Sequence, residues 1–350
     1  MPQKTRLEIL GEMVTGYSLA RHEAQMLPKN HARFAWYAHF RRLSPTSWSN
    51  PVNIPYVAAT TLLDAYSQLP RRPDLAFNSL WSATNNSYND LFLSGPQGAA
   101  SGTLTDKRSI DFSLSEIAAR LNQIVPIPPS PTVTAQGISI GDLIKRYLKN
   151  APARNFNFVA QYILRGIAVE EHNASAPPST AVRLILVPAA YWSFKKDFER
   201  VHAKLKSSMG VKYAKLCAIT ESSCRTELDF GIKPQDGNKA RGLVHQASLL
   251  LRQEALGASV TSGTVTGSFN SQQHWLSFLV RPLLYASRNN AAHGNAASRL
   301  NSLSTSGDSV TAASWTFLFC YLYFALILLC QAKITLADLE PLYENADLIN

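Results

Sequence analysis

The chain has 350 residues, 46% of them hydrophobic and 10% aromatic, which excludes a disordered protein and leaves room for one large domain or two ordinary ones. Its 34 Lys and Arg against 24 Asp and Glu give a net charge of +10, which favours a polyanionic partner such as nucleic acid or an anionic membrane surface. The charges are scattered along the chain, so the sequence does not locate a basic face.

Four cysteines form neither a C-x-x-C pair nor a spacing typical of zinc sites: Cys217, Cys224, Cys320 and Cys330. We therefore expect ordinary thiols in a reducing compartment, and no metal or other cofactor. Residues 1–8 lack the apolar core of a signal peptide, which predicts a cytoplasmic protein.

Hydrophobic spacing predicts helices in the first part of the chain at residues 5–27, 31–43, 56–69 and 77–92. A further helix is expected to begin near Ser113, because Ser113-x-x-Glu116 has the form of a capping box. Residues 31–43 interleave aromatic and basic side chains. Such a helix could stack bases and hold phosphates, although aromatic residues at helical spacing usually fill a core.

Aromatic side chains fall near one face of the helix expected at 77–92: Phe77, Trp81, Tyr88 and Phe92. Asn85 lies on the same face, four residues after Trp81. An amide in such surroundings needs a hydrogen-bond partner. Asn85 therefore either belongs to a polar site or fixes the packing of the helix.

The proline-rich residues 126–137 predict a linker. Beyond them, helices are expected again at 138–149, 154–170, 191–207 and 238–256. One β-branched run, 181–187, could form a strand.

The segment with the clearest functional pattern is 288–294, which reads Arg-Asn-Asn-Ala-Ala-His-Gly. It follows the apolar run 274–285 and precedes the most apolar part of the chain, 314–332. Two other arginine and histidine pairs have a similar spacing but lack the two asparagines and the glycine: Arg33 with His39, and Arg165 with His172.

An arginine followed by a polar residue, with a histidine five positions on and then a glycine, resembles the Arg-(4–6 residues)-His motif of the HEPN superfamily. Members of that superfamily are all-helical, and many are metal-independent RNases. The resemblance covers residues 55–95 and residues 238–335. In the first range, the helix with Trp81, Asn85 and Tyr88 is similar to an early bundle helix of the superfamily. It implies a mainly α fold, a HEPN-like bundle interrupted by a long, mostly helical insertion.

The resemblance divides the chain into four segments. They are an N-terminal helical extension (1–54), the first HEPN-like helices (55–95), a mostly helical insertion or middle domain (96–237), and C-terminal HEPN-like helices with the motif (238–350).

The geometry of a helix bears on how the motif could work. Five residues rotate by roughly 500°, so Arg288 and His293 would lie roughly 140° apart on a straight helix, whereas Asn289 and His293 would share a face. Arg288 and His293 converge only if the long arginine side chain bends over or if two molecules assemble the site. Members of the superfamily commonly dimerise with their motifs facing each other, which implies a homodimer with one composite site.

The residue types indicate the chemistry. Histidine titrates near neutrality, so His293 could take the proton from a ribose 2′-OH or give one to the leaving 5′-oxygen. Arg288 could donate two hydrogen bonds to the phosphate in the transition state. Asn289 and Asn290 are candidate supporting residues, and Asn85 is a more distant one. The expected substrate is RNA, and the products would carry 2′,3′-cyclic phosphate and 5′-OH ends.

The resemblance also implies a biological setting. A metal-independent RNA endonuclease of this kind would serve as a toxin or an anti-phage defence effector, with an antitoxin or another defence protein as a possible partner. Some members keep the fold without activity. The alternative is therefore a non-catalytic HEPN module that binds RNA or a nucleotide and regulates a partner protein.

The terminal apolar segment, 315–330, is near the length of a membrane span. It lacks a flanking cluster of Lys and Arg, and a buried bundle helix is equally apolar on all sides. We expect such a buried helix and no membrane association, with a membrane-anchored helical scaffold as the alternative.

Overall fold

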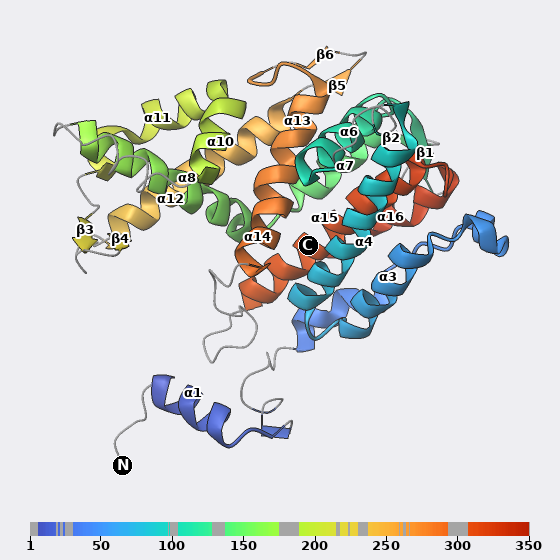
Figure 1. Ribbon diagram of the computed structural model, residues 1–350, viewed down its shortest axis with the longest axis horizontal. Coiled ribbons are helices and arrows are strands. Elements are labelled where there is room, and N and C mark those ends of the chain that lie inside the picture. Colours follow the sequence, from blue (N-terminus) through green and yellow to red (C-terminus); the bar gives the residue numbers. More distant parts are fainter. Residues whose placement is uncertain are drawn as a thin grey trace. The chain divides into compact units, whose positions relative to one another are not determined.

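The computed structural model describes residues 6–18, 20–21, 24, 31–96, 98, 104–127, 137–174, 189–214, 218–222, 225–229, 237–258, 260–261, 264–265, 267–292 and 307–349. The chain forms two compact units: unit 1 combines Met1–Pro152 with Leu284–Asn350, and unit 2 is Ala153–Leu283 (Figure 1). The described residues are mainly helical, which confirms the predicted mainly α fold.

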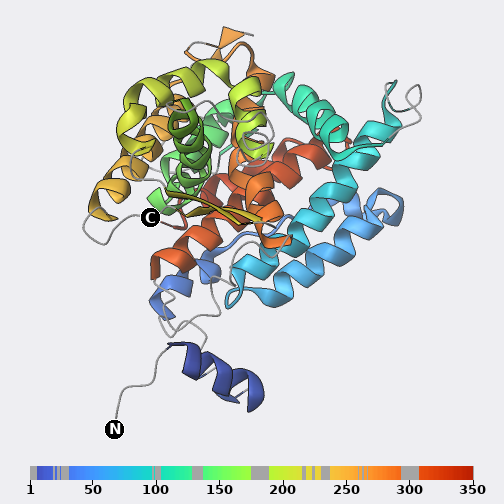
Figure 2. The ribbon, with the colours of Figure 1, turned by 60° about the vertical axis from the view of Figure 1, so that its left-hand side comes forward.

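Unit 1 contains the elements α1 (Arg6–Thr15), the 3-10 helices η1 (His31–His39), η2 (Thr46–Ser49) and η3 (Pro51–Asn53), α3 (Tyr56–Gln68), α4 (Pro73–Ser94), α6 (Asp106–Ala118), β1 (Ile124–Pro126), β2 (Gly137–Ser139), α7 (Ile140–Lys149), α14 (Ala286–Ala292), α15 (Gly307–Cys330), η6 (Ala337–Leu339) and α16 (Glu340–Asn345). Strands β1 and β2 are antiparallel, with Val125 opposite Ile138. Helices α3 and α4 lie side by side, and α4 also packs along α15 (Figures 1 and 2).

Helix α15 is the centre of unit 1. Elements α4, α6 and η1 pack against it, and every side chain from Ser314 to Leu328 is buried. A helix enclosed in this way can be apolar on all sides because no face meets water. This packing explains why the segment carries no polar stripe.

Two tyrosines connect α15 to its neighbours. The Tyr321 hydroxyl accepts a hydrogen bond from the backbone N–H of Leu43 at 2.7 Å and shares one with the Tyr66 hydroxyl at 2.5 Å. The hydroxyls of Tyr323 and Ser113 are 2.7 Å apart. Burial raises the pKa of Tyr321 to about 12, so its hydroxyl stays protonated. These directional bonds select one rotation of α15 about its axis.

Helix α15 is also long and apolar enough to cross a membrane. It has 24 residues and a mean hydropathy of 2.0 over its most apolar window, of which 83% is buried inside the structure. The core helix of a soluble protein passes the same test of length and composition. A buried bundle helix stays our prediction, with the membrane-anchored scaffold as its alternative.

The capping box predicted at Ser113 is wrong. Helix α6 begins at Asp106, where the Thr105 side chain accepts a hydrogen bond from the backbone N–H of Arg108 at 3.4 Å. Ser113 lies inside the helix, and its hydroxyl donates to the carbonyl of Ile110 at 2.8 Å. A serine can bond either a free N–H or the carbonyl one turn earlier, so the pattern alone does not mark the start of a helix.

Two N-terminal helices are shorter than predicted. Helix α1 ends at Thr15 rather than at residue 27, and η1 ends at His39 rather than at residue 43. Trp36 in η1 and Phe40 just after it lie in the core, with ring centres 6.4 Å and 5.8 Å from that of Phe317. These two aromatic residues therefore pack in the core of unit 1. This agrees with the second interpretation of the segment, that its aromatic residues fill a core, and not with base stacking.

Unit 2 contains α8 (Ala153–Ala174), α10 (Ala189–Asp197), α11 (Glu199–Ala214), β3 (Ala218–Ser222), β4 (Arg225–Asp229), α12 (Gly237–Gly257), β5 (Val260–Thr261), β6 (Thr264–Val265) and α13 (Gln272–Leu279). Its strands form two antiparallel hairpins, β3 with β4 and β5 with β6. Helix α8 packs against α11 and α12 (Figure 2). The run 181–187, predicted as a strand, lies outside the described residues.

The division into units differs from the predicted segments. We placed the insertion at 96–237, whereas the unit inserted in the chain is Ala153–Leu283. Helix α6 packs on α4 and α15 within unit 1, and α12 packs on α8 within unit 2. Hydrophobic periodicity predicts that a helix has a buried face but does not identify the helix that covers it.

A buried polar cluster holds three helices of unit 2 together. The Tyr191 hydroxyl of α10 donates to the Glu170 carboxylate of α8 and lies 2.9 Å from Nε2 of His202 of α11. Lys195 forms an ion pair with Glu170. Gly166 leaves room for the tyrosine ring, since a Cβ there would be 2.0 Å from Cγ of Tyr191. Because Tyr191 donates to the carboxylate, its oxygen can accept the Nε2–H of His202.

This cluster predicts that unit 2 is less stable in acid. Burial lowers the pKa of His202 from 6.5, although Glu170 opposes the effect. The unfolded chain therefore binds the proton first, and stability should fall as the pH drops below about 6.5. Burial alone would raise the pKa of Glu170, but hydrogen bonds from Lys195 and Tyr191 lower it below 4.5. Its stabilising contribution is thus present above pH 4.5 and is lost only in stronger acid.

Urea unfolding between pH 8 and pH 5 measures the histidine contribution. The wild type should lose stability across this range, and His202→Gln, which keeps a donor but does not titrate, should lose less. Hydrogen exchange of α10 and α11 assigns the change to unit 2. An equal loss in both proteins would contradict the role of His202.

Candidate functional site

The predicted motif begins on a helix with an irregular start. After α13, the segment η5 (Val280–Tyr285) has π-helical geometry, and α14 follows with Arg288 and Asn289. Pro282 lies inside η5, where it supplies no N–H and its ring would clash with the carbonyl four residues earlier in an α-helix. Single π-helical turns are frequent at functional sites.

Arg288 lies against its own helix. Its Nη1 donates to Oδ1 of Asn289 at 2.9 Å, and its guanidinium carbon is 6.0 Å from the ring centre of Tyr285, three residues earlier. Arg288 and Asn289 are both half-buried. The Arg288 guanidinium is therefore held against an aromatic ring and beside an amide. It has five N–H donors, of which the bond to Asn289 uses one.

The aromatic face of α4 lies beside this arginine. The rings of Trp81 and Tyr285 are 6.0 Å apart, and those of Trp81 and Tyr88 are 6.4 Å apart. Burial raises the pKa of Tyr88, as do Asp106 and two tyrosines, while the charge of Arg288 lowers it. The face of α4 singled out in the sequence and the arginine of the motif are thus neighbours in unit 1.

Two polar groups on this face are buried without a hydrogen bond among the described residues: the Tyr88 hydroxyl and the indole N–H of Trp81. Buried polar atoms of this kind nearly always have a partner, which can be protein, water or a bound molecule. These two groups are therefore candidates to contact something outside the part of the chain that the structure describes.

Asn85 lies between Trp81 and Tyr88 along the helix face. Its side chain is half-buried, and its Oδ1 accepts a hydrogen bond from Nδ2 of Asn89 at 2.9 Å. This bond supports the packing interpretation and leaves the amide N–H₂ of Asn85 as a possible donor in the site.

The end of the motif lies outside the described residues. These stop at Ala292, the last residue of α14, and begin again at Gly307, the first residue of α15. His293 and Gly294 fall in this gap, and the side chain of Asn290 is not described. The convergence of His293 on Arg288, within one molecule or between two, stays a prediction.

The two described cysteines are the buried Cys320 and the half-buried Cys330. Burial raises the pKa of the Cys320 thiol to about 12, and that of the Cys330 thiol likewise to about 12. Neither thiol is therefore prepared to act as a thiolate at neutral pH. Among the described residues, no group of three His, Cys, Asp or Glu side chains is placed to hold a metal ion.

Sequence reasoning named Arg288, Asn289 and Asn85 but not Tyr285 or the Tyr88 hydroxyl. A signal for Tyr285 was present, because an aromatic residue three positions before an arginine on a helix lies under its side chain. No such signal exists for Tyr88, since only the folded chain shows that its buried hydroxyl has no partner among the described residues.

Comparison with protein-family models, with curated proteins and with solved structures finds no match to this chain.

Proposed function

We propose that this protein is a metal-independent RNA endonuclease of HEPN type that uses Arg288 and His293. One observation carries the proposal: the arginine of the Arg-Asn-Asn-Ala-Ala-His-Gly segment lies beside the aromatic face of α4, which the resemblance assigns to the same bundle. The net charge of +10 suits an RNA substrate.

The reaction would transfer the phosphoryl group within the RNA strand. His293 removes the proton of a ribose 2′-OH, whose oxygen attacks the adjacent phosphorus and displaces the 5′-oxygen of the next nucleotide. The leaving oxygen takes a proton, which gives a 2′,3′-cyclic phosphate and a 5′-OH. Arg288 donates hydrogen bonds to the phosphate oxygens as the transition state forms.

Asn289 positions Arg288 through the hydrogen bond that its Oδ1 accepts from the guanidinium. Asn290 and Asn85 are further supporting residues. Two molecules would form a homodimer with the motifs facing each other. One composite site would then contain Arg288 and His293 of both chains. In this setting the protein acts as a toxin or an anti-phage effector, held in check by an antitoxin or another defence protein.

The test is cleavage of mixed-sequence RNA, DNA of the same sequence, and 2′-O-methyl RNA by the purified protein in EDTA. RNA should be cut and the other two spared, because only RNA carries the attacking hydroxyl. Cleavage of DNA would contradict the mechanism. Tight binding of RNA without cleavage would instead favour the non-catalytic HEPN module that regulates a partner.

Tyr88 allows a test that separates activity from stability. Tyr88→Phe removes a buried hydroxyl that has no partner among the described residues, so the free energy of unfolding should stay the same or rise slightly. If the hydroxyl binds the RNA phosphate, kcat/KM should fall about 10- to 100-fold, the range expected for a lost hydrogen bond to a charged group. An unchanged kcat/KM would remove Tyr88 from the site.

A further inference from the structure

A second arginine of unit 1 is held against aromatic rings, as Arg288 is. It is the exposed Arg42, which follows η1 in the segment that interleaves aromatic and basic residues. Its guanidinium carbon lies 5.7 Å from the ring centre of Tyr37 and 5.5 Å from that of Tyr66. Its Nη2 also donates to the Tyr37 hydroxyl at 2.9 Å. Two rings and a hydrogen bond therefore restrict a long side chain that is otherwise flexible at a surface.

The backbone on both sides of Arg42 is also fixed. The N–H of Arg41 donates to Oδ1 of Asn345 at 2.9 Å, and the carbonyl of Arg41 accepts from Nδ2 of the same asparagine at 2.8 Å. The N–H of Leu43 donates to the Tyr321 hydroxyl at 2.7 Å. Asn345 and Tyr321 are buried, so these bonds tie the segment to the core. Arg42 is therefore presented to solvent by a rigid backbone.

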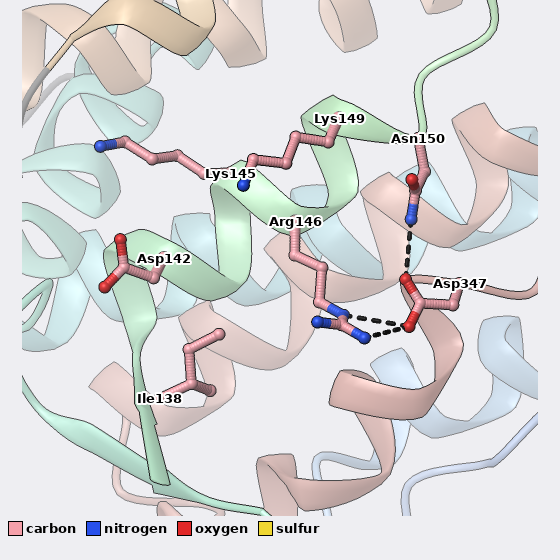
Figure 3. A pocket seen from close by; sticks show the side chains of 7 residues that line it. All are labelled: Ile138, Asp142, Lys145, Arg146, Lys149, Asn150 and Asp347. Atoms are coloured by element: carbon pink, nitrogen blue, oxygen red, sulfur yellow. Dashed lines mark hydrogen bonds and ion pairs between the residues drawn. The ribbon is translucent and has the colours of Figure 1, made fainter. Parts of the chain in front are cut away.

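Another arginine on an aromatic ring provides a comparison. The guanidinium carbon of Arg146 in α7 lies 4.2 Å from the ring centre of Tyr343. Its Nε donates to the Asp347 carboxylate at 3.1 Å, and Figure 3 shows the guanidinium turned toward that carboxylate. The positive charge of Arg146 is thus compensated within the protein.

Arg42 has no such partner, because no carboxylate of the described residues forms an ion pair with its guanidinium. The Glu344 carboxylate pairs with the preceding residue, Arg41, at 2.8 Å. A guanidinium has five N–H donors in a planar fork, and the bond to Tyr37 uses one of them. Two of the remaining donors can bond one phosphate in parallel, which is the geometry that makes arginine a good phosphate ligand.

We propose that Arg42 binds a backbone phosphate of a single-stranded RNA, as a contact outside the motif. This inference rests on the proposed function and names a further contact of the same substrate. The segment 31–43 then has two tasks: Trp36 and Phe40 fill the core, while Tyr37 holds Arg42 at the surface. A phosphate contact holds a strand without reading its sequence, so Arg42 raises the affinity for RNA in general.

The experiment measures binding of uncleavable 2′-O-methyl RNA to the full chain over a range of salt concentrations. Each phosphate contact to a single strand contributes about −0.7 to the slope of log K against log salt. Arg42→Ala should therefore make the slope less negative by about 0.7 and weaken binding to every sequence tested. Arg42→Lys keeps the charge but loses the planar fork, so it should keep the wild-type slope and lose part of the affinity.

A purely structural role for Arg42 predicts a different result. The side chain would then only pack on the rings of Tyr37 and Tyr66, so Arg42→Ala would lower the free energy of unfolding and leave RNA binding unchanged. Urea unfolding of the same variants separates the two roles. A less stable Arg42→Ala protein with the wild-type salt slope would overturn the proposal.

A matched control loses the same charge elsewhere. Arg200→Ala removes an exposed arginine of α11 and should keep the wild-type slope. Inorganic phosphate at equal ionic strength should compete poorly with RNA. Displacement of the RNA by an equimolar amount of phosphate would assign Arg42 to a small anion and contradict the proposal.

The failures are distinguishable. If the wild type does not bind 2′-O-methyl RNA, the RNA substrate of the proposed function is wrong, and this inference falls with it. If the wild type binds and the Arg42→Ala slope is unchanged, or the Arg200→Ala slope shifts as much, the inference alone is wrong.

Discussion

Replacing His293 by alanine should slow RNA cleavage by a factor of about 10² to 10⁴, the range expected for loss of a general acid–base group. The imidazole is the group of the motif that can accept a proton at neutral pH. Single-turnover cleavage of a labelled RNA measures the chemical step directly. His39→Ala is the matched control, because it removes an exposed histidine of η1 and should cleave at the wild-type rate.

Arg288 should show a different pattern from His293. Arg288→Ala removes the donors to the phosphate and should reduce the rate about 10² to 10³-fold. Arg288→Lys keeps the charge but loses the planar fork, so it should recover only part of the activity. Wild-type rates for both His293→Ala and Arg288→Ala would place the catalytic groups elsewhere in the chain.

Trp315→Ala should produce the largest loss of stability, about 3 to 5 kcal/mol, as for other large core residues. Trp315 is 2% exposed, stacks on Phe319 with ring centres 4.9 Å apart, and donates from Nε1 to the carbonyl of Tyr147 at 2.9 Å. The alanine variant would leave a cavity and a buried carbonyl that has lost a donor.

Urea unfolding followed by circular dichroism measures this effect. Trp192→Ala provides the comparison, because Trp192 is 38% exposed and its removal should cost much less. A loss for Trp315→Ala no larger than for Trp192→Ala would contradict the placement of α15 at the centre of unit 1.

Much of the fold followed from the sequence because helical periodicity is a local property. The predicted helix at 56–69 matches α3 (Tyr56–Gln68), and the one at 238–256 matches α12 (Gly237–Gly257) within one residue at each end. The partner of each helix could not be predicted in this way. Residues 106–118 and 237–257 have similar apolar faces, yet they belong to different units.

Part of the candidate site could be named from residue type and spacing. Arg288, Asn289 and the face with Trp81 and Tyr88 could be named from the sequence, and the structure places the arginine beside that face. The buried cluster of Glu170 and His202 could not be predicted, because its members are 32 positions apart on separate helices. Only the folded chain brings such residues together.

The most direct test of the central claim is the chemistry of the RNA ends left by the wild type and by His293→Ala, side by side in EDTA. We predict 2′,3′-cyclic phosphate and 5′-OH ends from the wild type and none from the variant. Products with 3′-OH and 5′-phosphate ends, or equal cleavage by both proteins, would contradict an RNase that uses His293.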